Sequence, residues 1–88
     1  MYSVIIHRRA AHYLQKLTPD QQIRIKRALN EISHDPFGLP EIKNMLGDWA
    51  GYKRIKVASI RIIFWVDKVK KIVYIDHIGS RGDVYKKS

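Results

Sequence analysis

The chain has 88 residues with 45% hydrophobic content, which fits one folded domain over residues 1–88 and excludes both a second domain and a disordered chain. It has no cysteine, which excludes disulfides, thiolate metal sites and cysteine nucleophiles. Its longest apolar run, residues 62–66, is far below the ~20 residues that span a bilayer, and residues 1–8 do not resemble a secretory signal. We therefore expect a soluble cytoplasmic protein.

The charge is strongly positive and unevenly distributed. Seventeen Lys and Arg against eight Asp and Glu give a net charge of +9. Residues 52–88 hold 10 basic and 3 acidic side chains, or +7, whereas residues 1–51 hold 7 and 5, or +2. This balance favours a polyanionic partner that binds the C-terminal half, although a basic surface can also serve solubility alone.

In the first half of the chain, one strand and two helices are expected. Residues 2–7 are short and β-rich, and from Arg8 onward apolar residues recur at the spacing of a helix face. Thr18 starts a second helix, because Pro19 suits the first helical position and Gln21 completes a capping box. This helix ends at residues 35–36, where a proline disfavours the α conformation of the residue before it.

The second half of the chain is expected to form strands. Residues 36–51 read as a connecting loop, with Leu46 and Trp49 holding it to the core, and Trp65 is likewise expected in the core. Strands follow at residues 52–57, 60–67 and 71–78, joined by hairpin connections at 58–59 and 67–70. The predicted fold is α+β, in the order β-α-α-β-β-β, with an antiparallel twisted sheet and two N-terminal helices packed on one face. The place of the first strand in the sheet stays open.

Strand alternation determines which basic side chains can converge. Arg54 and Lys56 share one face of their strand, and Arg61 interrupts an otherwise apolar strand, where an arginine usually has a specific reason to be. Arg81 and Tyr85 follow the end of the last strand. These five side chains can line one electropositive sheet face. The four histidines lack metal-ligand spacing and no glycine-rich phosphate loop is present, so we expect no metal or cofactor.

Three segments carry a resemblance to a known family. Residues 51–57 read GYKRIKV, residues 60–64 read IRIIF, and residues 77–85 read HIGSRGDVY. Together with the helix pair and the exit at residues 35–36, they resemble the RelE branch of the RelE/ParE toxin superfamily. The resemblance implies a RelE-like fold over the whole chain and a ribosome-dependent mRNA endonuclease that cuts messenger RNA in the A site without a metal.

The same resemblance implies roles for five residues. Lys56 falls at the position of the general base, with Arg54 as the other member of the basic pair. Arg61 matches the arginine that stabilises the transition state, Arg81 the general acid or phosphate clamp, and Tyr85 the tyrosine that stacks on the nucleotide. The implied partners are the ribosome and mRNA, and an acidic, partly disordered, RelB-like antitoxin through which the complex binds operator DNA.

Several alternatives remain open at this point. Ser80 stands where many relatives have His or Lys, and His77, two residues earlier on the same strand face, is a candidate substitute. Lys53 would enter the site only if the strand register moved by one residue. The alternative functions are a ParE-like inhibitor of DNA gyrase and a non-catalytic basic RNA-binding module.

Overall fold

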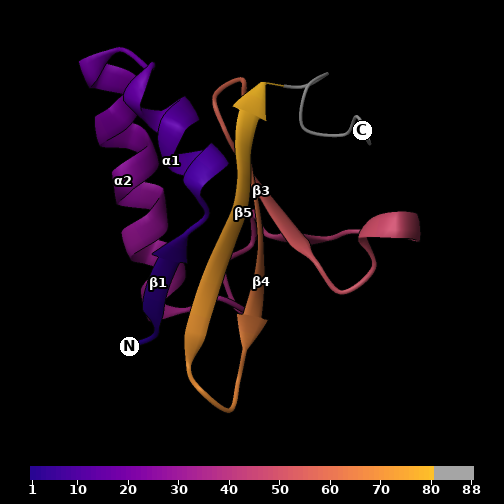
Figure 1. Cartoon of the computed structure of the whole chain (residues 1–88). Coiled ribbons are helices and arrows are strands. Elements are labelled where there is room, and N and C mark those ends of the chain that lie inside the picture. Colours follow the sequence, from indigo (N-terminus) through magenta and orange to yellow (C-terminus); the bar gives the residue numbers. More distant parts are fainter. Residues whose placement is uncertain (81–88) are drawn as a thin grey trace.

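The structure, a computed structural model that describes residues 1–80, has a five-stranded mixed sheet with two helices on one face (Figure 1). The order across the sheet is β1-β5-β4-β3-β2. The strands are β1 (Ser3–Ile6), β2 (Lys43–Asn44), β3 (Lys53–Val57), β4 (Ile60–Asp67) and β5 (Ile72–Ser80). The predicted α+β arrangement is confirmed.

Both helices begin at capped residues. In α1 (Arg8–Gln15), His7 is the N-cap, and its Nδ1 accepts a hydrogen bond from the Arg9 backbone N–H at 3.1 Å. In α2 (Pro19–His34), Thr18 and Gln21 form the predicted capping box, with both hydrogen bonds at 3.2 Å. The helix ends as predicted at residue 34, before the Asp35–Pro36 pair.

The three C-terminal strands form the predicted antiparallel meander, with β4 in the centre and β3 and β5 on either side. The first strand lies beside β5 and pairs with it in parallel, from Ser3 opposite Ile72 to Ile6 opposite Ile75. This parallel pair makes the sheet mixed. It also places the N-terminal strand at the edge opposite β2, the position that the sequence left open.

One main core fills the space between the helices and the sheet. Alternate residues of the strands face the helices, as expected from the two-residue period of a strand. Among the fully buried side chains of this core, the largest are Phe64, Ile25, Ile32, Ile62, Ile75 and Val73. Because the helices cover only this face, the opposite face of the meander is free to carry other side chains.

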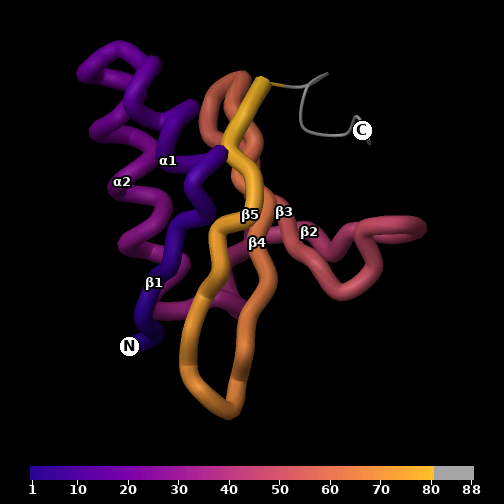
Figure 2. Tube along the Cα trace, viewed as in Figure 1, coloured from indigo at the N-terminus to yellow at the C-terminus, as the bar shows by residue number. Residues whose placement is uncertain are grey.

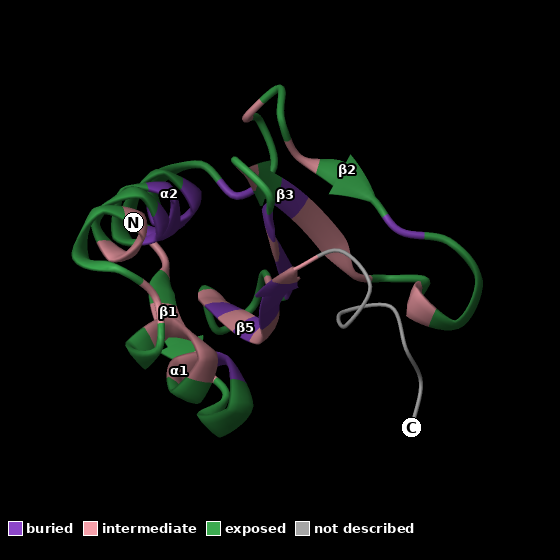
Figure 3. Cartoon of the chain, turned by 90° about the horizontal axis from the view of Figure 1, so that it is seen from above, coloured by how far each residue is buried: buried purple, intermediate pink, exposed green. Residues whose placement is uncertain are grey.

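The segment between α2 and β3 differs from the predicted loop. It contains β2 and a short 3-10 helix, η1 (Gly47–Trp49), and it extends away from the helices on the other side of the sheet (Figures 2 and 3). Trp49 packs against a second small core of Met45 and Ile63. Leu46, expected to hold the loop to the core, is instead 86% exposed, because Met45 fills the place beneath the loop.

Trp65 also lies outside the predicted core. It is 36% exposed on the face opposite the helices, where its ring stacks on that of Tyr74 at a centroid distance of 4.4 Å. The reason is strand parity, since Phe64 takes the position that faces the helices. No helix within residues 1–80 has the length and apolar content needed to cross a bilayer.

Candidate functional site

The sheet face away from the helices carries three of the basic residues predicted for the site. On β3, Ile55 and Val57 pack in the main core, so Arg54 and Lys56 point to the opposite side. On β4, Ile60 and Ile62 pack in the same core, so Arg61 points to that side too. We call this surface, made of Arg54, Lys56, Arg61, His77 and Gly79, the open face.

Cross-strand register places the basic side chains next to one another. Lys56 lies directly opposite Arg61, and Arg61 lies directly opposite Gly79. Side chains at directly opposite positions start about 4.5 to 5.5 Å apart at their Cβ atoms. The row Lys56–Arg61–Gly79 therefore presents two adjacent cations, and the glycine beside Arg61 is buried.

A second row runs parallel to the first, two residues along each strand. Arg54 lies opposite Ile63, and Ile63 lies opposite His77. On the outer side of Arg54, Lys43 of β2 is its cross-strand partner. Ile63 is fully buried, because the small core around Trp49 covers it. This row therefore has an apolar centre with cationic side chains on one side and an imidazole on the other.

A shallow pocket adjoins the second row. It has a volume of about 340 Å³ and is lined by Asn44, Met45, Leu46, Trp49 and Arg54. The β2–η1 segment forms one wall of the pocket and Arg54 belongs to the open face. The pocket extends the cationic surface toward the exposed tip of the loop at Leu46.

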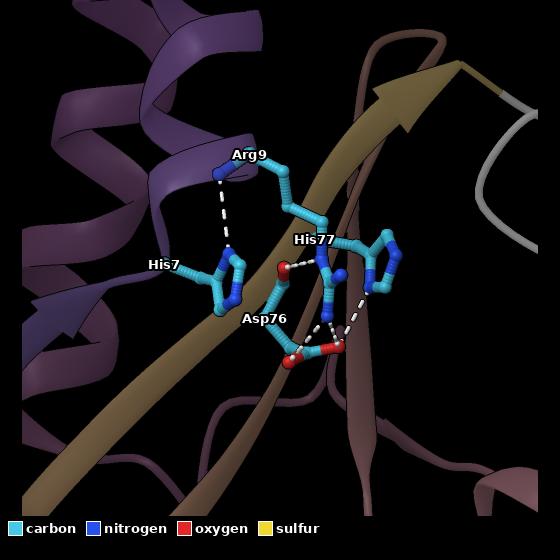
Figure 4. A network of polar contacts seen from close by, with 4 residues as sticks. All are labelled: His7, Arg9, Asp76 and His77. Atoms are coloured by element: carbon cyan, nitrogen blue, oxygen red, sulfur yellow. Dashed lines mark hydrogen bonds and ion pairs between the residues drawn. The ribbon is translucent and has the colours of Figure 1, made fainter.

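His77 has two fixed neighbours. Its Nδ1 lies 2.7 Å from the Asp76 carboxylate, and its ring meets the ring of Trp49 edge-on at a centroid distance of 5.2 Å. The Asp76 carboxylate also binds the guanidinium of Arg9 on α1, with an N–O distance of 3.3 Å (Figure 4). Apart from an acidic residue within an apolar strand, no sequence pattern predicts the contacts of His77 with Asp76 and Trp49.

Lys53 does not belong to the open face. Its strand parity is that of Ile55, and its Nζ donates a hydrogen bond to Asn44 Oδ1 at 2.7 Å and lies 5.3 Å from the centre of the Phe37 ring. The register that would bring Lys53 into the site is therefore absent, since Lys53 pairs with Phe64 and Arg54 with Ile63.

The structure places three of the five residues assigned by the resemblance. Arg54, Lys56 and Arg61 share the open face, together with the candidate His77. Ser80 is the last residue of β5, half-buried and opposite Ile60. Arg81 and Tyr85 lie outside the described residues, so their assignment stays a prediction.

Known structures share this fold. A RelBE toxin–antitoxin complex from Mycobacterium tuberculosis matches with a TM-score of 0.79 and 23% identity, over 91% of this chain and 98% of that chain. The intact RelBE complex from E. coli matches with a TM-score of 0.77 and 23% identity, over 92% and 98%. YafQ from E. coli strain BL21(DE3) matches with a TM-score of 0.79 and 10% identity, over 98% and 100%.

No protein-family model and no curated protein sequence matches the chain. The similarity is therefore one of structure, and it confirms the fold inferred from the sequence: the chain has the RelE-like toxin fold.

Proposed function

We propose that this chain is the toxin of a type II toxin-antitoxin pair and that it cleaves messenger RNA on the ribosome. The observation that carries the proposal is the row in which Lys56 faces Arg61, with Arg54 on the same open face of a RelE-like fold. Such a cationic surface, uncovered by the helices, suits an RNA backbone.

The proposed reaction needs no group beyond protein and RNA. The 2′-hydroxyl of the message attacks the adjacent phosphorus, the bond to the 5′-oxygen breaks, and the products carry a 2′,3′-cyclic phosphate and a 5′-hydroxyl. Three things are required: a base for the 2′-hydroxyl proton, positive charge around the phosphorane, and an acid for the leaving oxygen.

The basic residues of the open face match two of these requirements. Arginine keeps its charge and binds phosphate oxygens in pairs, so Arg61 and Arg54 are suited to stabilise the phosphorane. Lysine is the one of the three that can exchange a proton, so Lys56 is suited to take the proton from the 2′-hydroxyl. The ribosome would contribute by holding the message in a reactive conformation, because correct placement of the reacting atoms removes part of the barrier.

The proposal includes partners. The antitoxin is expected to be acidic, because the toxin carries +9. Two of the similar structures are complexes of a RelE toxin with its antitoxin, which supports a partner of that type here. Operator binding by the complex would come through the antitoxin.

The experiment is primer extension on a defined message in a reconstituted translation system, with and without ribosomes. Native chain should produce cuts only on ribosome-bound message, and Arg61→Ala should lower the cleavage rate about 100-fold or more, because it removes charge stabilisation at the phosphorane. Lys70→Ala, which removes an exposed cation from the turn between β4 and β5, is the matched control and should cleave like the native chain.

Two results would contradict the proposal. If the native chain makes no cuts but causes gyrase-dependent DNA breaks, the protein is a gyrase inhibitor of the ParE type. If it binds RNA with an affinity that falls with salt and makes no cuts, the open face is a passive RNA-binding surface.

A further result concerns Arg61 alone. Equal cleavage by native chain and Arg61→Ala would remove Arg61 from the site.

A further inference from the structure

The last strand contains a β-bulge at Asp76. Ile63 on β4 pairs with His77, whereas the next residue, Phe64, pairs with Ile75, so Asp76 has no partner on β4. The extra residue shifts the alternation of β5 by one. As a result, Ile75 faces the helices and packs in the main core, while His77 faces the other side, on the open face.

The bulge is held in place by α1. The Arg9 guanidinium donates to the backbone carbonyl of Asp76 at 3.2 Å and to its two carboxylate oxygens at 3.3 and 3.4 Å (Figure 4). The same carboxylate lies 2.7 Å from His77 Nδ1. The Asp76 side chain is 17% exposed, so most of its surface is buried.

This contact determines which nitrogen of His77 is available for chemistry. An ionised carboxylate can only accept hydrogen bonds, so Nδ1 carries a proton in both the neutral and the charged imidazole. Any proton that His77 gains or loses is therefore on Nε2. Trp49 packs edge-on against the His77 ring and holds it from a second side. The His77 side chain is 25% exposed.

His77 lies close to the proposed phosphate site. It is the diagonal neighbour of Arg61 across β4 and β5, at a separation of about 7 to 8 Å between backbone positions, which long side chains span. Among the described residues, the charged groups nearest to it are Asp76 on its own strand, Arg61 on the neighbouring strand β4 and Arg9 on α1, while Arg54 lies one strand further away on β3.

We propose that His77 is the general acid of the cleavage reaction and that Asp76 is its positioning residue, an assignment that rests on the proposed function. As the 2′-oxygen forms its bond to phosphorus, the bond from phosphorus to the 5′-oxygen breaks, and Nε2 transfers its proton to that oxygen. Lys56 receives the proton of the 2′-hydroxyl, so protons balance. An arginine does not release its proton readily, which leaves the imidazole as the better acid on this face.

The first test uses a message whose scissile 5′-oxygen is replaced by sulfur. A thiolate leaves without being protonated, so loss of the general acid should no longer matter. His77→Asn should cleave the normal message about 100-fold or more slowly in a single turnover on ribosomes, and should cleave the sulfur-containing message at close to the native rate. Arg61→Ala should stay slow on both messages, and His12→Asn, an exposed histidine of α1, should be native-like on both.

The outcomes separate the two proposals. If the native chain cleaves neither message, both the proposed function and the acid role fail. If the native chain cleaves and His77→Asn is equally slow on both messages, only the acid role is overturned, because a structural or binding defect is not relieved by a better leaving group. If His77→Asn cleaves normally, His77 does not take part.

The second test determines which ring nitrogen of His77 carries the proton, and it does not require a measurement of activity. In the full-length chain labelled with ¹⁵N-histidine, NMR shifts of the His77 ring nitrogens should report a proton on Nδ1. Asp76→Asn should reduce this preference and slow cleavage of the normal message by up to about 100-fold, with little change in the half-saturating ribosome concentration. Asp76→Asn conserves side-chain size, and its NMR spectrum shows whether the fold is intact. An unchanged ring signal would overturn the positioning role.

Discussion

Two lysines three residues apart on β3 have different surroundings, although both are part of one basic segment. Lys56 is exposed on the open face, opposite Arg61, whereas Lys53 binds Asn44 Oδ1 and lies near the Phe37 ring. Alternation along a strand is sufficient to separate them, because odd and even positions point to opposite faces. Parity thus puts the two lysines on different faces although they carry the same charge.

This separation predicts different effects of the same substitution. Lys56→Ala should lower the rate of ribosome-dependent cleavage about 100-fold or more, because it removes the proposed base. Lys53→Ala removes the same charge from the same strand and should change the rate less than about threefold. The comparison is made by single-turnover primer extension with both variants. Equal losses would indicate that total charge, and not the row with Arg61, is what the reaction requires.

At the scale of the elements, two irregularities of the meander shape the open face. The bulge on β5 turns His77 toward that face. The hairpin between β3 and β4 has a two-residue turn, Ala58 and Ser59. The pair that closes this turn is followed by the pair of Lys56 and Arg61, so the turn sets their alignment. Ala58 has a φ of 56°, which lies in the left-handed region. A residue with a side chain is less stable in this region by about 1 to 2 kcal/mol. A turn that places a positive φ first usually has glycine there.

Ala58→Gly should therefore stabilise the fold. Glycine removes the strain at this φ, which stabilises the folded state. It also gives the unfolded chain more conformational freedom, which lowers the free energy of unfolding by about 0.4 to 1 kcal/mol, and the first effect is expected to be larger. We expect Tm to rise by about 4 °C in thermal unfolding followed by circular dichroism. Ser59→Gly is the matched control, since Ser59 does not have a positive φ, and it should lower Tm. A fall in Tm for Ala58→Gly would show that the strain is not relieved at this turn.

At the scale of the whole molecule, the two helices bury one face of the sheet in the main core, and the basic residues of β3 and β4 lie on the face that the helices do not cover. The helices bury one sheet face, and the β2–η1 segment covers only the middle of the other, over Ile63. The net charge of +9 gives the protein a field that attracts acidic partners at a distance.

If the chain is the toxin proposed above, an acidic antitoxin should form a tight complex with it and relieve the growth inhibition that the toxin causes. The measurement is growth on co-expression with the adjacent small reading frame, followed by co-purification. Relief of toxicity together with a stable complex is the expected result. The partner assignment is contradicted if the two chains neither co-purify nor restore growth, while the cleavage reaction itself would be unaffected by that outcome.

Most of the elements and the face shared by three site residues could be predicted from the sequence. The capping box at Thr18, the exit before Pro36 and the strand alternation that groups Arg54 with Lys56 are local properties, since each depends on residues within a few positions of one another. The short turn between β3 and β4 is local too. It pairs Lys56 with Arg61, so the two side chains point to the same face of the sheet.

Other features were decided only by the tertiary structure. The parallel pairing of β1 with β5 joins residues about seventy positions apart, and nothing in either segment specifies it. The same holds for the Asp76 bulge, which depends on Arg9 from α1, and for the exposure of Leu46, which depends on Met45 filling the space beneath the loop. These outcomes result from competition between distant segments for the same partners and the same buried volume. Local pattern therefore determined that Arg54 and Lys56 share a face, whereas tertiary contact determined that His77 joins them there and how it is held.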